Sequence, residues 1–142
     1  MDLLDDIASC RLCAGRFEAT RTAHQPRPIV RAKASARILI AGQAPGARVH
    51  ASGQPFGDPS GDRLRNWMGL TRDQFYDASR IAIVPMAFCF PGTTAKGADL
   101  PPPPICAHTW RAQVLDTLPN IQLTLLVGGY AQKWHLKSSS VT

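Results

Sequence analysis

Four cysteines are the residues of this chain with the clearest potential for chemistry. Cys10 and Cys13 form a C-x-x-C pair near the N-terminus, and Cys89 and Cys106 flank the proline-rich segment FPGTTAKGADLPPPPI. A redox C-x-x-C normally opens a helix after a strand, and no strand precedes this pair. Structural zinc usually takes two close pairs, whereas one close pair plus two single cysteines fits an iron–sulfur cluster at least as well. The pattern favours a four-thiolate metal site, and it leaves zinc, an iron–sulfur cluster and four unrelated buried thiols open.

The elements that must position these residues follow from the apolar segments. Three continuous apolar runs are typical of buried strands: 37–42, 81–86 and 121–129. Helices are expected in the segments between and beside them: 2–8, 60–70, 107–118 and 130–136. Strands that alternate with helices predict a central parallel sheet covered on both faces. We therefore expect a single α/β domain over residues 1–142, with the segment between Cys89 and Cys106 too rich in proline for helix or sheet.

The stretch AGQAPGARVHASGQPFGDPSG, residues 41–61, directly follows the first of these strands. In open α/β sheets, ligands bind beyond the carboxyl ends of the strands. Glycine lets the backbone approach a ligand and turn N–H groups toward it. No G-K-S/T follows, so the stretch is not a Walker A loop, and the Rossmann fingerprint G-x-G-x-x-G is absent. The composition predicts an irregular ligand loop at the mouth of the sheet.

The charge of the chain points to an anionic partner. The net charge is +6 with a pI near 9.6. The excess is concentrated in the basic segment 11–37, where one acid, Glu18, stands among seven cations: Arg11, Arg16, Arg21, Arg27, Arg31, Lys33 and Arg37. Such a segment attracts phosphates through counterion release, or else forms a solvated face. No apolar run suits a membrane helix, and the acidic N-terminus is no signal peptide, so we expect a cytoplasmic protein.

The segments RILIAGQAPG, GQPFGDPSGDRL and IAIVPMAFCFPG, with the four cysteines, resemble the uracil-DNA glycosylase superfamily. The resemblance runs from Cys10 to about Leu136 and is strongest to the iron–sulfur family 4 enzymes and their bacterial relatives. It implies a three-layer α/β/α sandwich and a 4Fe–4S cluster held by Cys10, Cys13, Cys89 and Cys106. It also implies a hydrolase of base excision repair that flips uracil or another deaminated base out of DNA and cleaves the N-glycosidic bond. We expect a nucleoid-associated monomer.

The resemblance assigns roles to individual residues of the ligand loop. Gln43 and the backbone of Ala44 would contact the leaving base and position water, and Phe56 would stack on the flipped base. Pro85 stands where family 4 has an asparagine that reads uracil, and Ala44 replaces the catalytic aspartate of the best-known members. His50 is a candidate general acid or phosphate contact, with a surface histidine as the alternative reading.

The chain ends at WHLKSSSVT, where family members continue into a strand and an H-P-S motif. We therefore expect a truncated fold that lacks the last strand and helix and excises bases poorly. The alternatives are a catalytically inactive nucleic-acid-binding fold and a zinc-stabilised binding module.

The segment 60–70 carries further expectations. Ser60 is the expected N-cap, and Leu64, Trp67 and Met68 share an inward face. Its cations, Arg63 and Arg65, are expected to contact phosphate or solvent.

Overall fold

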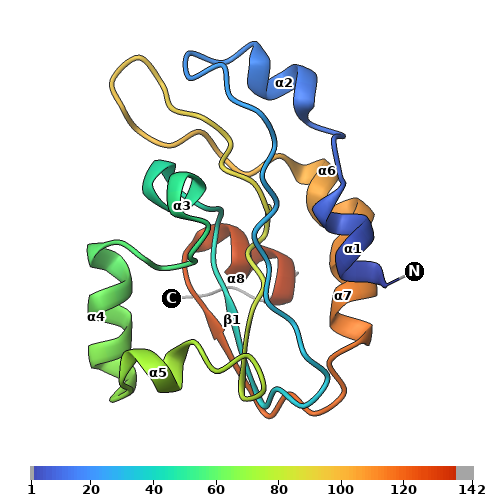
Figure 1. Cartoon of the computed structure of the whole chain (residues 1–142), viewed down its shortest axis with the longest axis vertical. Helices are drawn as coiled ribbons and strands as arrows, with labels where there is room; N and C mark the ends of the chain where they lie inside the picture. Colours follow the sequence, from blue (N-terminus) through green and yellow to red (C-terminus); the bar gives the residue numbers. More distant parts are fainter. Residues whose placement is uncertain (1, 137–142) are drawn as a thin grey trace.

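Three parallel strands form the centre of the protein, which we describe from a computed structural model for residues 2–136 (Figure 1). β1 (Ile38–Ala41) lies between β2 (Ile81–Ile83) and β3 (Leu123–Leu126). In the register, Ile38 of β1 lies opposite Ile81 and Leu123. Helices flank this parallel sheet, which confirms the predicted α/β architecture. The polar end KSSSVT, residues 137–142, lies outside the described residues.

The four predicted helices are present with small changes in their bounds, and α2, α3 and α5 are additional short helices. They are α1 (Leu3–Ala8), α2 (Ala14–Glu18), α3 (Ala47–Ser52), α4 (Pro59–Met68), α5 (Arg72–Phe75), α6 (Pro104–Cys106), a π-helical turn (Ala107–Arg111), α7 (Ala112–Asp116) and α8 (Gly129–Leu136). The segment 104–116 is one continuous helical stretch, so the helix begins three residues before the predicted start. Proline at the first position of α6 explains the difference, because that position needs no backbone donor and suits the fixed φ of proline.

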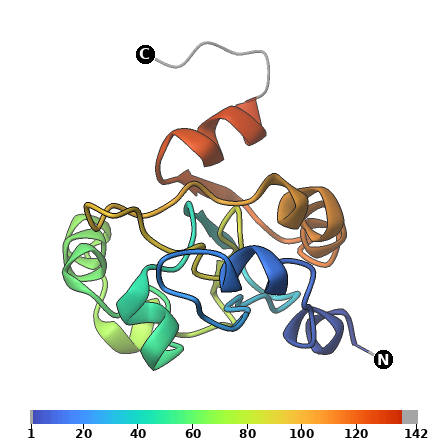
Figure 2. The same cartoon turned by 90° about the horizontal axis from the view of Figure 1, so that it is seen from above.

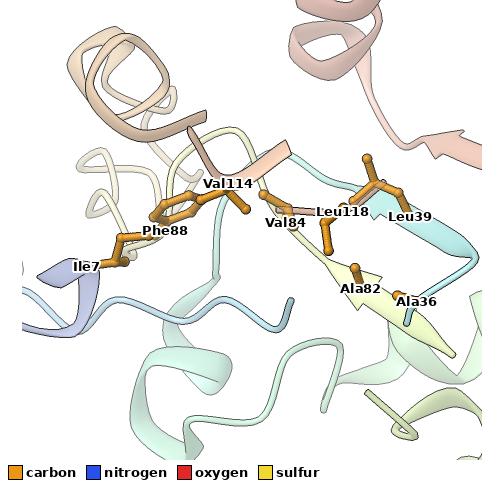
Figure 3. Packing of buried hydrophobic residues seen from close by; sticks show 8 residues of the cluster. All are labelled: Ile7, Ala36, Leu39, Ala82, Val84, Phe88, Val114 and Leu118. Atoms are coloured by element: carbon orange, nitrogen blue, oxygen red, sulfur yellow. The ribbon is translucent and has the colours of Figure 1, made fainter. Parts of the chain in front are cut away.

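Alternating side chains of β1 face opposite layers of helices. Leu39 belongs to a cluster with Ile7 of α1 and Val114 of α7, which Figure 3 shows in place. Ile40 points the other way, into a cluster with Phe75 of α5 and the partly buried Leu64 of α4. This alternation is the two-residue period of a strand buried on both faces. The predicted covering of the sheet on both faces is therefore confirmed.

β3 is less buried than the sequence predicts. Leu123 is 51% exposed and Val127, just after the strand, is 37% exposed. β3 pairs with β1 alone among the described strands, and the nearby α8 buries only Ala131 fully. Figure 2 shows α8 beside β3 and well away from α1. The expectation of a third buried strand is wrong, because an apolar run does not reveal which neighbours cover it.

Two further local expectations are also wrong. The stretch 41–61 is not wholly irregular, since it contains α3, which ends at Gly53 in the left-handed conformation (φ 76°). Trp67 of α4 is 75% exposed rather than part of the core. No helix among residues 2–136 is long and apolar enough to cross a membrane.

Candidate functional site

A cleft opens at the carboxyl ends of all three strands. Its lining combines the segment after β1, the turn before α4, Pro85 after β2 and Gly128 after β3. Gln43, Phe56 and Pro85, which the sequence predicts to share one cleft, all line it. Its volume is about 260 Å³, near the lower end of the roughly 300–1,000 Å³ typical of ligand pockets. The cleft is therefore of a size for a small ligand, in the place that an open α/β sheet provides for one.

The segment after β1 forms part of the wall of this cleft, with Gly42, Gln43 and Ala44 among the lining residues. Its carbonyls are turned toward the chain beyond β2: Met86 N donates to Gly42 O at 2.9 Å, and Ala87 N donates to Gln43 O at 3.0 Å. The amides of Gln43 and Ala44 donate to no other backbone group of residues 2–136. The two carbonyls hold this segment against the chain beyond β2, and the amides of Gln43 and Ala44 are its candidate donors to an anion.

Phe56 lies at the cleft in an unusual backbone conformation. Its φ is 56°, a left-handed value that side-chain-bearing residues seldom adopt. The half-buried ring meets the Phe75 ring edge-to-face, with centroids 5.9 Å apart. A Cβ on Gly42 would lie 3.5 Å from the tip of the Phe56 ring, an ordinary contact distance, so the ring lies close beside the end of β1. The ring thus forms one wall of the cleft.

The start of α4 brings a carboxylate to the cleft. Asp58 lines the cleft and is the N-cap of α4, where its Oδ1 accepts a hydrogen bond from Gly61 N at 3.1 Å. The expected N-cap, Ser60, instead donates to Asp58 Oδ1 at 2.6 Å, so that expectation is wrong. Burial raises the pKa of the nearby Asp99 carboxyl, and the charge of Asp58 raises it further.

His50 lies on α3, and its ring packs against other rings. The centroid distances are 5.1 Å to His24 and 5.6 Å to Phe90. The His50 side chain is not among the groups that line the cleft. Burial lowers the pKa of His50, and the nearby His24 and Arg27 lower it further, which favours the neutral ring at neutral pH. The placement gives the ring no direct path to a ligand in the cleft.

All four cysteines line a second, apolar cavity. Cys10 and Cys13 reach it from the N-terminal segment, and Cys89 and Cys106 from the two ends of the proline-rich segment. Two sulfurs accept hydrogen bonds: Trp110 Nε1 donates to Cys10 Sγ at 3.4 Å, and Phe88 N donates to Cys106 Sγ at 3.3 Å. The structure therefore brings together thiols that lie far apart in the sequence, as the prediction of convergence requires.

The cavity makes two of the thiols, those of Cys89 and Cys106, poor acids. Burial raises the pKa of Cys89 to about 12 and that of Cys106 to about 11. Among residues 2–136, no three His, Cys, Asp or Glu side chains are grouped so that they could hold a metal ion. The four thiols therefore lie around one cavity, but they are not grouped as a set of ligands around a single ion.

The family comparison agrees with the position of the cleft. Residues 29–141 match the uracil DNA glycosylase superfamily. The chain belongs to this superfamily. The members act on DNA and share the α/β fold.

Two arginines near the cleft are buried, which the sequence did not predict. Arg65 is 4% exposed and Arg111 is fully buried. Arg111 donates to the carbonyls of Val84 and Pro85 at 3.1 and 3.0 Å, and its Nη2 lies 2.8 Å from His135 Nε2. The expectation that Arg65 contacts phosphate or solvent is wrong. The one sequence signal was Asp62, an acid one helical turn before Arg65.

Proposed function

We propose that this chain binds DNA and excises uracil or another deaminated base by hydrolysis of the N-glycosidic bond. The observation that carries the proposal is a cleft, in a chain of the uracil DNA glycosylase superfamily, that Phe56 lines together with Gln43 and Ala44, whose amides donate to no backbone group of residues 2–136. A base inside a duplex cannot reach such a cleft, so the target nucleotide must flip out of the stack.

Phe56 and the amides of Gln43 and Ala44 have different roles in this proposal. Stacking on Phe56 holds the flipped base and contributes about 1–3 kcal/mol. Cleavage leaves an oxocarbenium-like sugar and an anionic base. The amides of Gln43 and Ala44 stabilise that anion, because their fixed orientation requires no reorganisation as the charge develops.

The same cleft lacks two groups that would speed uracil excision. Ala44 offers no carboxylate to activate water, and Pro85 has no side-chain hydrogen bond with which to read uracil. Removing one preorganised catalytic donor typically costs about 10²–10³ in rate. We therefore infer slow excision, and a binding fold without catalysis is the second candidate, favoured by these two residues.

We propose a 4Fe–4S cluster for the cysteine cavity. Four thiols, an apolar lining and hydrogen bonds to Cys10 and Cys106 suit such a cluster, whose stability depends on burial and on hydrogen bonds to sulfur. Each cysteine of a cluster binds a different iron, so its sulfurs stand farther apart than the four around one zinc ion. Bound here, the cluster would attach the N-terminal segment to the sheet. Zinc is the alternative.

The basic segment 11–37 supports binding of the DNA backbone. The two ion pairs of residues 2–136, Arg65 with Asp62 and Arg80 with Asp77, both lie outside this segment. Within it, Arg11 donates to Gln25 Oε1, and Arg27 donates to the carbonyls of His50 and Ala51. These partners are neutral, so the positive charge stays available to phosphates.

The test measures excision and binding on the same DNA. A uracil-containing duplex is incubated with the protein and treated with alkali, which breaks the strand at abasic sites, while binding is followed at two salt concentrations. The proposal predicts slow but specific strand breakage and salt-sensitive binding. Binding without any breakage would favour the non-catalytic candidate, and absence of both would refute the proposal.

A further inference from the structure

The conformation of Phe56 requires an explanation. Gly57 N donates to Gln54 O at 3.2 Å, so residues 54–57 form a β-turn with Pro55 and Phe56 at its centre. A positive φ at the third position of such a turn normally selects glycine or asparagine. A phenylalanine there is strained, and strain of this kind persists only where the surrounding structure holds it.

Two side chains hold the peptide groups on either side of Phe56. Tyr76 Oη donates to Pro55 O at 2.7 Å, and Arg65 Nη1 donates to Phe56 O at 3.2 Å. These two carbonyls belong to the peptide planes that flank the Phe56 Cα. Because φ and ψ are the rotations of those planes about that atom, fixing both planes fixes the backbone of Phe56.

Arg65 and Tyr76 also hold each other. Arg65 Nη1 lies 3.2 Å from Tyr76 Oη, and the guanidinium lies 5.5 Å from the centre of the Tyr76 ring. On its other side, Arg65 Nη2 donates to Asp62 Oδ1 at 2.5 Å. A buried, multiply bonded guanidinium has little freedom, so it is a rigid support for the carbonyl that it binds.

α4 passes so close to the turn that only glycine fits. A Cβ on Gly61 would lie 1.8 Å from the Phe56 carbonyl oxygen. The turn, Gly61 and Arg65 are therefore packed as one unit, which places the Phe56 ring at the cleft.

We propose that Arg65 and Tyr76 are positioning residues that clamp Phe56 in its left-handed conformation and so present its ring to the flipped base. The proposal rests on the proposed function for the role of the ring, whereas the clamp itself is a property of the fold. Neither side chain needs to touch DNA; both act through Phe56.

The binding test is a double-mutant cycle. The probe is a short duplex with one 2′-fluoro-2′-deoxyuridine, whose glycosidic bond resists hydrolysis, compared with the same duplex carrying thymidine. Tyr76→Phe and Arg65→Met should each lower the preference for the modified duplex by roughly three- to tenfold, as expected for loss of the one hydrogen bond that each side chain makes to the turn. In a Phe56→Ala background, neither change should lower it further. Arg63→Met, an exposed arginine on the same helix, is the control for loss of charge.

The second measurement does not depend on DNA. In protein labelled with 4-fluorophenylalanine, the Phe56 signal in the ¹⁹F NMR spectrum is assigned by its loss in Phe56→Ala. The clamp predicts that this signal shifts or splits in Tyr76→Phe and Arg65→Met, while the Phe17 signal keeps its position.

An unchanged Phe56 signal in both variants would overturn the clamp, as would equal losses of preference with and without the Phe56 ring. If the unaltered protein shows no preference for the modified duplex, the proposed function fails, and the NMR spectrum alone then decides for or against the clamp.

Discussion

Replacing Gly61 with alanine tests the packing that supports the cleft. The added Cβ would lie 1.8 Å from Phe56 O, against an ordinary contact of at least 3.4 Å, so helix and turn must separate by about 1.5 Å. Overpacking of this kind costs about 1–3 kcal/mol, and breaking the Arg65–Phe56 hydrogen bond adds about 1 kcal/mol. The better helix propensity of alanine offsets about 1 kcal/mol. We expect a net loss of about 1–3 kcal/mol in the free energy of unfolding.

The assay is thermal unfolding followed by circular dichroism. For a chain of this size, the expected loss corresponds to a fall in Tm of roughly 3–10 °C. The matched control is Gly15→Ala in the exposed helix α2, where the new Cβ meets nothing within 4 Å. That change should leave Tm unchanged or raise it. A Gly61→Ala protein as stable as the unaltered one would refute the close approach of α4 and the turn.

Four other predictions follow from the cleft, the cysteine cavity and the charges. Phe56→Ala should weaken the preference for a flipped base by roughly 5- to 150-fold, from about 1–3 kcal/mol of stacking, with only a small change in Tm. Phe75→Ala, at a fully buried position, should instead cost about 3–5 kcal/mol of stability, and equal stability losses in the two variants would mean that Phe56 is a plain core residue. Cys89→Ser should remove the visible iron–sulfur absorption of protein purified without oxygen and lower Tm; an unaltered spectrum would exclude Cys89 as a ligand. DNA affinity should fall steeply between low and moderate salt, and a flat salt profile would exclude phosphate contacts by the basic segment 11–37. Burial and the charge of Arg111 lower the pKa of His135 to about 4. The neutral ring therefore stabilises the fold above pH 6.5, and this contribution is lost as the pH falls toward 4. His135→Gln should flatten that part of the Tm–pH profile, and an identical profile would contradict the assignment.

The sequence by itself located the strands of the sheet, the loop that lines the cleft and the four cysteines of the second cavity. Continuous apolar runs located β1 and β2, because strands buried in a parallel sheet must be apolar throughout. A third run located β3, although β3 is much less buried than the other two strands. The motif after β1 located the cleft, because the ends of parallel strands meet at one edge. These are local rules, and they apply before the chain folds.

Only the tertiary structure decided which groups are buried and what they hold. Trp67 is exposed and Arg65 is buried, the reverse of what their side chains suggest, because Arg65 finds Asp62, Tyr76 and the Phe56 carbonyl as partners. A buried charge is tolerated only when such partners surround it, and most of them come from other elements of the fold. The left-handed Phe56 is decided in the same way: its own turn disfavours the conformation, and hydrogen bonds from α4 and from Tyr76 impose it.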